Sequence, residues 1–468
     1  MSATRIETDF LGSRELTDAM YYGVQTLRGI ENFHITGIPI SNEPYLIQAF
    51  GYVKKAAALA NRDLGVLPAN ITDAILQACD RLIAGQYLDQ FPTDMIQGGA
   101  GTSTNMNANE VLANVALEIL GHPKGSYTII SPNDHVNCSQ STNDAYPTAF
   151  RVALINRMRS YRATMIKLVE AFSSKGNEFA QVLKMGRTHL QDAVPMSMGD
   201  EFHGFATNLQ EEIDRIDASV RLLTEVNMGA TAIGTSVNAP AGYPELVVKY
   251  LSELTDIELR LAPDLVEATS DTGAYVQLSG TIKRTAVKLS KICNDLRLLA
   301  SGPRCGFNEI NLPQLQPGSS IMPGKVNPVI PEVVNQAAFF VIGNDVTITL
   351  AASAGQLQLN VMEPVLGFAL FSSIKSMENA MIALREKCVI GITANAERTR
   401  ENVLASLGIV TLLNPVLGYK KCAEIAREGF ELNKSIHQIV VLEKQLITQE
   451  KWDELFNFEN LIHPHFIQ

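Results

Sequence analysis

Apolar residues recur at helical spacing over most of the chain after residue 148. The clearest stripe follows alternating steps of three and four residues, which mark one buried face of an amphipathic helix. Its members are Phe202, Phe205, Leu209, Ile213, Ile216, Val220 and Leu223. Similar stripes run over residues 152–172 and 278–299. The pattern therefore predicts long helices packed in a bundle.

Two further segments, residues 331–352 and 363–394, are apolar almost all round. A helix without a polar face has to be surrounded by other helices, in this chain or in neighbouring subunits. Five helices of some 25 to 30 residues would each be near 40 Å long, at about 1.5 Å per residue, and rods of that length favour bundle packing.

The remaining sequence contains shorter helical stretches separated by loops rich in Gly and Asn. Residues 46–64 and 71–83 are predicted helices of a first domain, and short helices return after Asn395. We expect an N-terminal domain at 1–143 that carries Gly- and Asn-rich loops, a central bundle at 144–395, and a small C-terminal helical domain at 396–468. The fold class is mainly α: a long five-helix central bundle flanked by two smaller, mostly helical domains.

Composition limits the function. Hydrophobic residues make up 46% of the chain and charged residues 19%, so part of the apolar surface needs covering by other subunits. A net charge of -11 argues against nucleic acid and against an anionic membrane surface. The apolar run at 337–343 is interrupted by Asn344 and Asp345, and residues 1–10 lack a secretory signal, so we expect a soluble protein. Six scattered cysteines indicate reduced thiols in the cytoplasm.

One polar loop stands out between apolar helices, at residues 318–328 (GSSIMPGKVNP). Two hydroxyls, a lysine and an amide lie there between glycine hinges, as in a loop that closes over a substrate. A phosphate-binding loop is excluded, because five residues separate the glycines and Val326 follows the lysine. The alternative is an ordinary turn at the start of a helix, with Pro328 in the first turn.

Three other segments are polar and bear glycine or hydroxyl residues: 98–107 (GGAGTSTNMN), 139–147 (SQSTNDAYP) and 186–195 (GRTHLQDAVP). Together with 318–328, and in this order along the chain, they resemble the conserved segments of the aspartase/fumarase superfamily. His189 alone would more often be a structural histidine, but within such a segment it is a candidate site residue. The other histidines, including His463 and His465, lack metal-ligand spacing and are interpreted as structural.

The resemblance implies a lyase that removes ammonia from L-aspartate and releases fumarate. Ser319 would abstract the proton from the carbon beside the side-chain carboxylate, and preorganised donors would stabilise the enediolate-like intermediate. The catalytic candidates are Ser319 and His189. The substrate-binding candidates are Thr102, Ser141, Thr142, Asn143, Thr188, His189, Ser320, Lys325 and Asn327. Lys325 and Asn327 would hold the second carboxylate, and Asn143 the amino group. The scheme requires no metal and no cofactor.

Flanking segments at 227–235, 328–336 and 356–364 are more similar to the ammonia-lyase branch of the family than to its hydratase branch. A class II fumarate hydratase and an inactive structural relative are the alternatives. One departure is Ser236-Val237, where the family commonly has Gly-Leu. The resemblance also implies a homotetramer whose active sites are shared between subunits, with small molecules rather than nucleic acid or membranes as partners.

Overall fold

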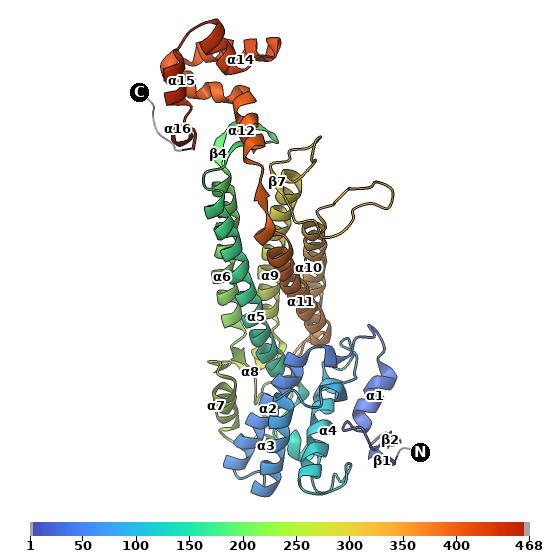
Figure 1. Ribbon diagram of the computed structural model, residues 1–468. Coiled ribbons are helices and arrows are strands. Elements are labelled where there is room, and N and C mark those ends of the chain that lie inside the picture. The colour runs from blue at the N-terminus through green and yellow to red at the C-terminus, as the bar shows by residue number, and fades with distance from the viewer. Residues whose placement is uncertain (1–2, 463–468) are drawn as a thin grey trace. The chain divides into compact units, whose positions relative to one another are not determined.

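The computed structural model describes residues 3–462, which are mainly helical (Figure 1). His463 and His465, interpreted above as structural, lie outside the described residues. The chain divides into two compact units that alternate along the sequence. Among the described residues, the first unit comprises 3–163, 214–286 and 339–377, and the second comprises 164–213, 287–338 and 378–462.

Five long helices contribute residues to both units, and all five were predicted from the apolar stripes. They are α5 (Thr142–Glu178), α6 (Met198–Leu222), α9 (Gly273–Leu299), α10 (Val329–Ser353) and α11 (Glu363–Lys387). The predicted extension of the last helix to residue 394 is wrong. The chain leaves the helix at Cys388, makes a short turn and pairs β8 (Thr393–Ala394) with β7 (Ile310–Asn311).

The first unit also contains a β-hairpin, a short parallel strand pair and a set of shorter helices. The elements are β1 (Thr4–Asp9), β2 (Gly12–Thr17), α1 (Val24–Asn32), α2 (Pro44–Asp63), α3 (Ala69–Ile83), α4 (Thr102–Ile119), β5 (Glu225–Val226), α7 (Tyr243–Thr255), β6 (Arg260–Leu261) and α8 (Leu265–Ser270). Helix α2 packs against α3 and α7, and α4 packs against α3 and α1. The predicted helices at 46–64 and 71–83 are confirmed as α2 and α3.

Aromatic contacts join the long helices within each unit. In the first, the ring of Phe150 on α5 lies 4.7 Å from that of Tyr275 on α9 and 5.4 Å from that of Phe371 on α11, between centroids. In the second, the ring of Phe172 on α5 lies 5.7 Å from that of Phe205 on α6. Such pairs stabilise by about 0.5–1.5 kcal/mol beyond their buried area.

The second unit also contains a β-hairpin and the C-terminal helices. These are β3 (Leu183–Thr188), β4 (Gln191–Ser197), α12 (Ala396–Ala405), α13 (Asn414–Leu417), α14 (Tyr419–Leu432), α15 (Gln449–Leu455) and α16 (Phe458–Ile462). Leu183 and Met185 of the hairpin belong to the same buried cluster as Val403, Ile425 and Leu455. The hairpin is therefore part of the hydrophobic core of the C-terminal elements.

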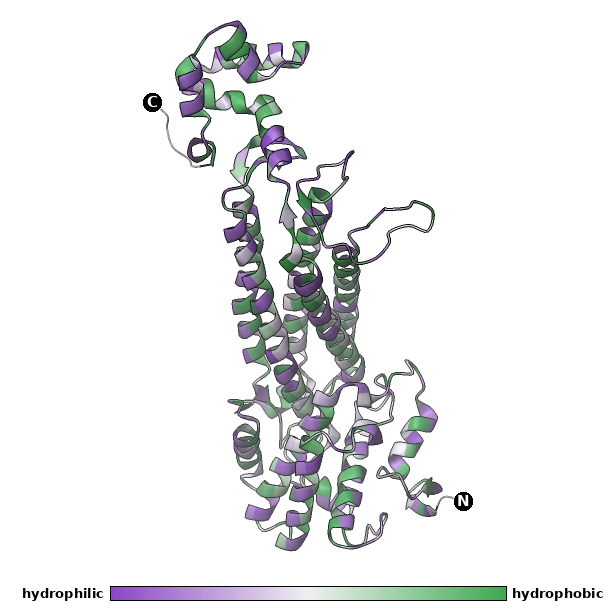
Figure 2. Ribbon diagram, in the orientation of Figure 1, coloured by the Kyte–Doolittle hydropathy of each residue, from purple (hydrophilic) through white to green (hydrophobic). Residues whose placement is uncertain are grey.

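Helix α10 differs from the sequence-based expectation that no segment is long enough and apolar enough to cross a membrane. It is 25 residues long and apolar enough by length and composition to cross a membrane, and apolar residues recur along it (Figure 2). Its polar side chains are nevertheless engaged within the protein: Asp345 accepts hydrogen bonds from Ser279 at 2.7 Å and Lys283 at 2.5 Å. Asn344 donates to Ser373 at 3.0 Å. These partners are typical of a helix packed against other helices of the protein.

Candidate active site

The loop at 318–327 is closed at its base by two hydrogen bonds in the second unit. The N–H of Gly318 donates to the carbonyl of Lys325 at 2.7 Å, and Asn327 Nδ2 donates to the carbonyl of Gly318 at 2.8 Å. A Cβ at position 318 would lie only 2.8 Å from the Asn327 nitrogen and from the Lys325 carbonyl oxygen. Only glycine allows this closure, so the sequence motif sets the loop geometry directly.

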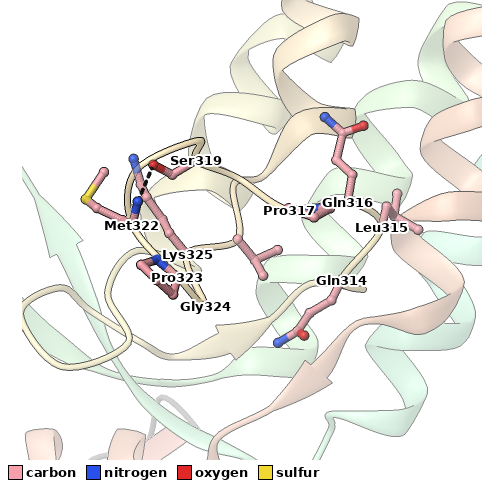
Figure 3. Close-up of a pocket in the computed structure, with 10 residues that line it drawn as sticks. Gln314, Leu315, Gln316, Pro317, Ser319, Met322, Pro323, Gly324 and Lys325 are labelled. Atoms are coloured by element: carbon pink, nitrogen blue, oxygen red, sulfur yellow. Dashed lines mark hydrogen bonds between the residues drawn. The ribbon is translucent and has the colours of Figure 1, made fainter.

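Ser319 receives backbone hydrogen bonds within this loop. Its Oγ accepts from the N–H of Met322 at 2.9 Å and from that of Ile321 at 3.2 Å (Figure 3). Donors aimed at an oxygen favour its ionised form, so both N–H groups make the Ser319 hydroxyl easier to deprotonate. Ser320 and Ile321 at the tip are exposed.

A hollow of about 460 Å³ is lined by this loop and by the residues just before it (Figure 3). Its lining residues are Gln314, Leu315, Gln316, Pro317, Ser319, Met322, Pro323, Gly324, Lys325 and Val326. Lys325 is the charged side chain among them, so it brings a positive charge to the hollow that Ser319 lines. The hollow is large enough for a small dicarboxylate.

Thr188 and His189 lie at the turn of the β3–β4 hairpin, also in the second unit. Thr188 pairs with Gln191, and the two residues between them, His189 and Leu190, have left-handed backbone conformations with φ of 55° and 61°. A side chain in this region costs roughly 1–2 kcal/mol, and turns of this kind usually contain Asn or Gly instead. Both side chains are exposed, so the strained turn presents the imidazole to solvent.

The base of this hairpin contains a buried ionic network that the sequence reasoning missed. Glu309 is fully buried, and its carboxylate lies 2.6 Å from Arg187 Nη1 and 3.1 Å from Lys184 Nζ. Lys184 also pairs with Glu201 at 2.5 Å, and the Arg187 guanidinium lies 4.4 Å from the centroid of the Phe307 ring. The network ties the hairpin to the segment that precedes the 318–327 loop. Arg187 lies in the polar segment at 186–195, but no motif in the sequence around Glu309 marked that residue.

Thr102 lies at the start of α4 in the first unit. Gly101, which precedes it, has φ of 87°, and a Cβ there would lie 2.4 Å from the buried ring of Tyr146. Thr102 Oγ1 donates to the carbonyl of Gly99 at 2.7 Å. The glycines of this motif therefore let the chain pass against an aromatic ring as the helix begins.

Ser141, Thr142 and Asn143 form the start of α5, also in the first unit. Ser141 Oγ accepts from the N–H of Asn143 at 3.2 Å, and Asn143 Nδ2 donates to the carbonyl of Ala232 at 2.7 Å. The carboxylate of Asp144 accepts from the N–H groups of Ser141 at 3.0 Å and Thr231 at 2.8 Å. Burial raises the pKa of Asp144 to about 6, against these hydrogen bonds and the charge of Lys54.

The candidate residues thus form two sets. The first unit holds Thr102, Ser141, Thr142 and Asn143 on the first turns of α4 and α5 and the residue before α5. The second unit holds Thr188 and His189 on one hairpin and Ser319, Ser320, Lys325 and Asn327 on one loop. Within each set, backbone and side-chain hydrogen bonds hold polar groups at the ends of helices, at a turn or on a loop.

Comparison with known proteins identifies the family. A family model described as lyase matches residues 12–343, and one described as fumarase C C-terminus matches residues 409–463. The chain is 56% identical to the aspartate ammonia-lyase of Pseudomonas aeruginosa, covering 100% of this chain and 98% of that protein. It is 55% identical to that of Escherichia coli, covering 99% and 97%. The chain belongs to the aspartase/fumarase family.

Solved structures of similar sequence share this family fold. A fumarate lyase:delta crystallin from Brucella melitensis, bound to cobalt, has a TM-score of 0.96 and 49% identity, covering 99% of this chain and 100% of that one. A class II fumarase from Schistosoma mansoni has a TM-score of 0.92 and 34% identity over 99% and 100% of the two chains. The predicted mainly α, aspartase/fumarase fold is confirmed.

The departure from the aspartase/fumarase pattern at Ser236 coincides with a backbone constraint. Ser236 has φ of 55°, in the left-handed region that glycine adopts at little cost. Its N–H donates to the carbonyl of Ala230 at 3.1 Å, which holds the turn after 227–235. A serine here keeps the turn that a glycine would make, with added strain.

Proposed function

We propose that this chain is an aspartate ammonia-lyase, which converts L-aspartate reversibly into fumarate and ammonia. The observation that carries the proposal is the match to curated aspartate ammonia-lyases over essentially the whole chain, at 56% identity for the protein from Pseudomonas aeruginosa and 57% for that from Corynebacterium glutamicum. A carbon–nitrogen lyase of this kind needs a base for a carbon-bound proton and donors for the carboxylate that gains charge.

Ser319 is the proposed base for the proton on the β carbon of aspartate. The two backbone N–H groups at its Oγ and the positive charge of Lys325 in the same hollow support this role, because both favour the alkoxide. Lys325 and Asn327 are proposed to bind the carboxylate that does not gain charge, with Ser320 at the loop tip donating to the other.

The residues of the first unit suit the remaining substrate groups. The hydroxyls of Ser141 and Thr142 are proposed donors to the enediolate-like intermediate, and the Thr102 hydroxyl is a third once its hydrogen turns from the Gly99 carbonyl to the substrate. Asn143 Nδ2 is engaged by Ala232, so the amide presents Oδ1, an acceptor that suits the substrate ammonium. Thr188 and His189 are proposed contacts to the carboxylate bound by Lys325.

The substrate assay separates the proposed activity from its relatives. Absorbance of fumarate is followed with L-aspartate, malate and argininosuccinate as parallel substrates. Fumarate formation from aspartate alone supports the proposal, and a signal with malate but not aspartate identifies a hydratase. Ser319→Ala is expected to abolish turnover with the oligomer intact. Substantial residual activity in that variant would remove Ser319 as the base.

A homotetramer with sites shared between subunits is the proposed assembly. Its support is an exposed stripe on α10 at helical spacing, formed by Phe339 (62% exposed), Gly343, Val346 (58%) and Leu350 (64%). Exposed apolar side chains in one row are typical of a subunit interface. Phe339→Glu is expected to lower the molar mass measured by light scattering, and an unchanged tetramer would exclude the stripe from the interface.

The cytoplasm is the proposed compartment. The six cysteines are unpaired, and four of them, Cys79, Cys293, Cys388 and Cys422, are buried. Free thiols in a packed core suit a reducing compartment.

The domain limits at residues 143 and 395 also stay predictions.

A further inference from the structure

Lys54 is a buried cation in the middle of α2, and its hydrogen-bond partners are all amide oxygens. Its side chain is 0% exposed. Its Nζ donates to Asn105 Oδ1 at 2.7 Å, Gln140 Oε1 at 2.9 Å and Asn137 Oδ1 at 3.1 Å. All three ammonium hydrogens are therefore matched by an acceptor, and within residues 3–462 the ammonium makes no direct ion pair.

This arrangement is costly for a purely structural position. Burial lowers the pKa of Lys54 to about 7, while the negative charge of Asp144 opposes that shift. A desolvated ammonium is expensive even when it is hydrogen-bonded, and apolar side chains of similar volume in place of both the lysine and its amide partners would fill the same space at lower cost. The three amide partners therefore indicate a positioning role.

The partners of Lys54 belong to the two segments that carry the first set of candidate residues. Asn105 lies in the first turn of α4, three residues after Thr102, and Asn137 and Gln140 precede Ser141. Seven residues along the same face of α2, Asn61 Nδ2 donates to the carbonyl of Cys138 at 3.0 Å, and its Oδ1 accepts from Ser139 Oγ at 2.6 Å. Helix α2 thus holds the 137–140 segment at two places.

A chain of hydrogen bonds leads from Lys54 to a candidate substrate donor. Because Asn105 Oδ1 accepts from Lys54, the orientation of this amide is fixed. Its Nδ2 then donates to Thr142 Oγ1 at 3.1 Å. An oxygen that accepts in this way turns its own hydrogen elsewhere, so the Thr142 hydroxyl is set to donate.

We propose that Lys54 is a positioning residue for the lyase reaction: through Asn105 it holds the Thr142 hydroxyl with its hydrogen available to the substrate carboxylate. The inference rests on the proposed role of Thr142 in binding that carboxylate. Lys54 acts without touching the substrate.

A double-mutant cycle tests the relay. Thr142→Val removes the donor and is expected to lower kcat on the order of 100-fold, as for one donor to a developing oxyanion. Lys54→Met is expected to lower kcat about tenfold or more with a smaller change in KM, because the misdirected hydroxyl fails mainly in the transition state. If Lys54 acts through Thr142, the double variant loses little more than Thr142→Val alone.

The matched control combines Lys54→Met with Thr102→Val, because the Thr102 hydroxyl bonds to the Gly99 carbonyl and lies outside the relay. Those two effects should multiply. Asn105→Leu breaks the same relay without changing the charge, and replaces Lys54→Met in the cycle if that variant does not fold. Lys54→Arg, which keeps the buried donors, should restore part of kcat.

The outcomes are distinguishable. Effects of the Lys54 and Thr142 substitutions that multiply fully would overturn the positioning role while leaving Thr142 in the site. Normal kcat and KM in Thr142→Val would instead overturn the proposed role of Thr142 itself. Circular dichroism and light scattering of each variant confirm that folded oligomers are compared.

Discussion

Gly101→Ala tests whether the start of α4 needs a glycine for packing as well as for backbone conformation. Gly101 has φ of 87°, and an added Cβ would lie 2.4 to 2.6 Å from three ring carbons of Tyr146. The ring cannot move aside easily, because Tyr146 is 2% exposed and its centroid is 6.1 Å from that of Phe50 and 6.3 Å from that of Phe150.

The expected loss of unfolding free energy has two parts. A left-handed conformation costs an alanine roughly 1–2 kcal/mol, and overpacking against a fixed ring costs about 1–3 kcal/mol more. Gly121, just after the other end of α4, has φ of 79° and nothing within 4 Å of an added Cβ. Gly121→Ala is therefore the matched control, and it is expected to lose only the backbone part. The smaller entropy of the unfolded alanine chain affects both variants equally.

The assay compares urea unfolding of the two variants and the wild type by circular dichroism at one protein concentration, since subunit association contributes to apparent stability. Gly101→Ala should be less stable than Gly121→Ala by about 1–3 kcal/mol. It should also lose on the order of 10- to 100-fold in kcat/KM for aspartate, because a shifted helix start moves Thr102. Equal stabilities and equal kcat/KM values for the two variants would refute the packing argument.

Three further predictions concern the other constrained positions. Glu309→Ala leaves Lys184 and Arg187 without their buried carboxylate, so it should lower the unfolding free energy by about 3–5 kcal/mol and speed hydrogen exchange in β3 and β4. The control Glu258→Ala removes the exposed partner of Arg260 and should cost less than about 1 kcal/mol. Equal losses in the two variants would contradict the stabilising role of the network. Ser236→Gly should raise the urea midpoint, by relief of roughly 1 kcal/mol of left-handed strain, and a lower midpoint would argue against strain there. Burial raises the pKa of Asp144 from 3.8 to about 6, so the folded state binds the proton more tightly than the unfolded state and the unfolding free energy falls as pH rises from about 4 to about 6. This fall should be about 3 kcal/mol smaller in Asp144→Asn than in the wild type. Parallel pH profiles of the two proteins would refute the prediction.

The long helices could be predicted because their signal is local and repeated. In a stripe such as Phe202, Phe205 and Leu209, an apolar residue recurs in every helical turn. The same three residues are buried in α6, as the pattern predicts. The end of α11 was misplaced because residues 388–394 stay apolar beyond the helix. Ile392 is buried and β8 pairs with β7, so apolarity there marks strand and turn packing instead.

For the candidate site, the sequence predicted only those residues that lie within recognisable motifs. Gly318 and Gly101 are needed where a Cβ would collide with backbone or with a ring, and both stood out in the sequence. Glu309 did not, because its partner Lys184 lies 125 positions away, counted from the residue numbers 184 and 309. Nor did Lys54, which stands beside Lys55 in the sequence and is distinguished only by its hydrogen bonds to amides on two other segments.

Ser141 and Ser319 share one local arrangement but interact with different charged groups. In each, Oγ accepts a hydrogen bond from a backbone N–H two or three residues further along, at 3.2 Å for Ser141 and 2.9 Å for Ser319. The N–H of Ser141, however, donates to the Asp144 carboxylate, whereas the hollow at Ser319 contains Lys325. A nearby anion disfavours an alkoxide and a nearby cation favours it. The same turn chemistry therefore suits Ser141 to keep its proton as a donor and Ser319 to lose its proton as a base.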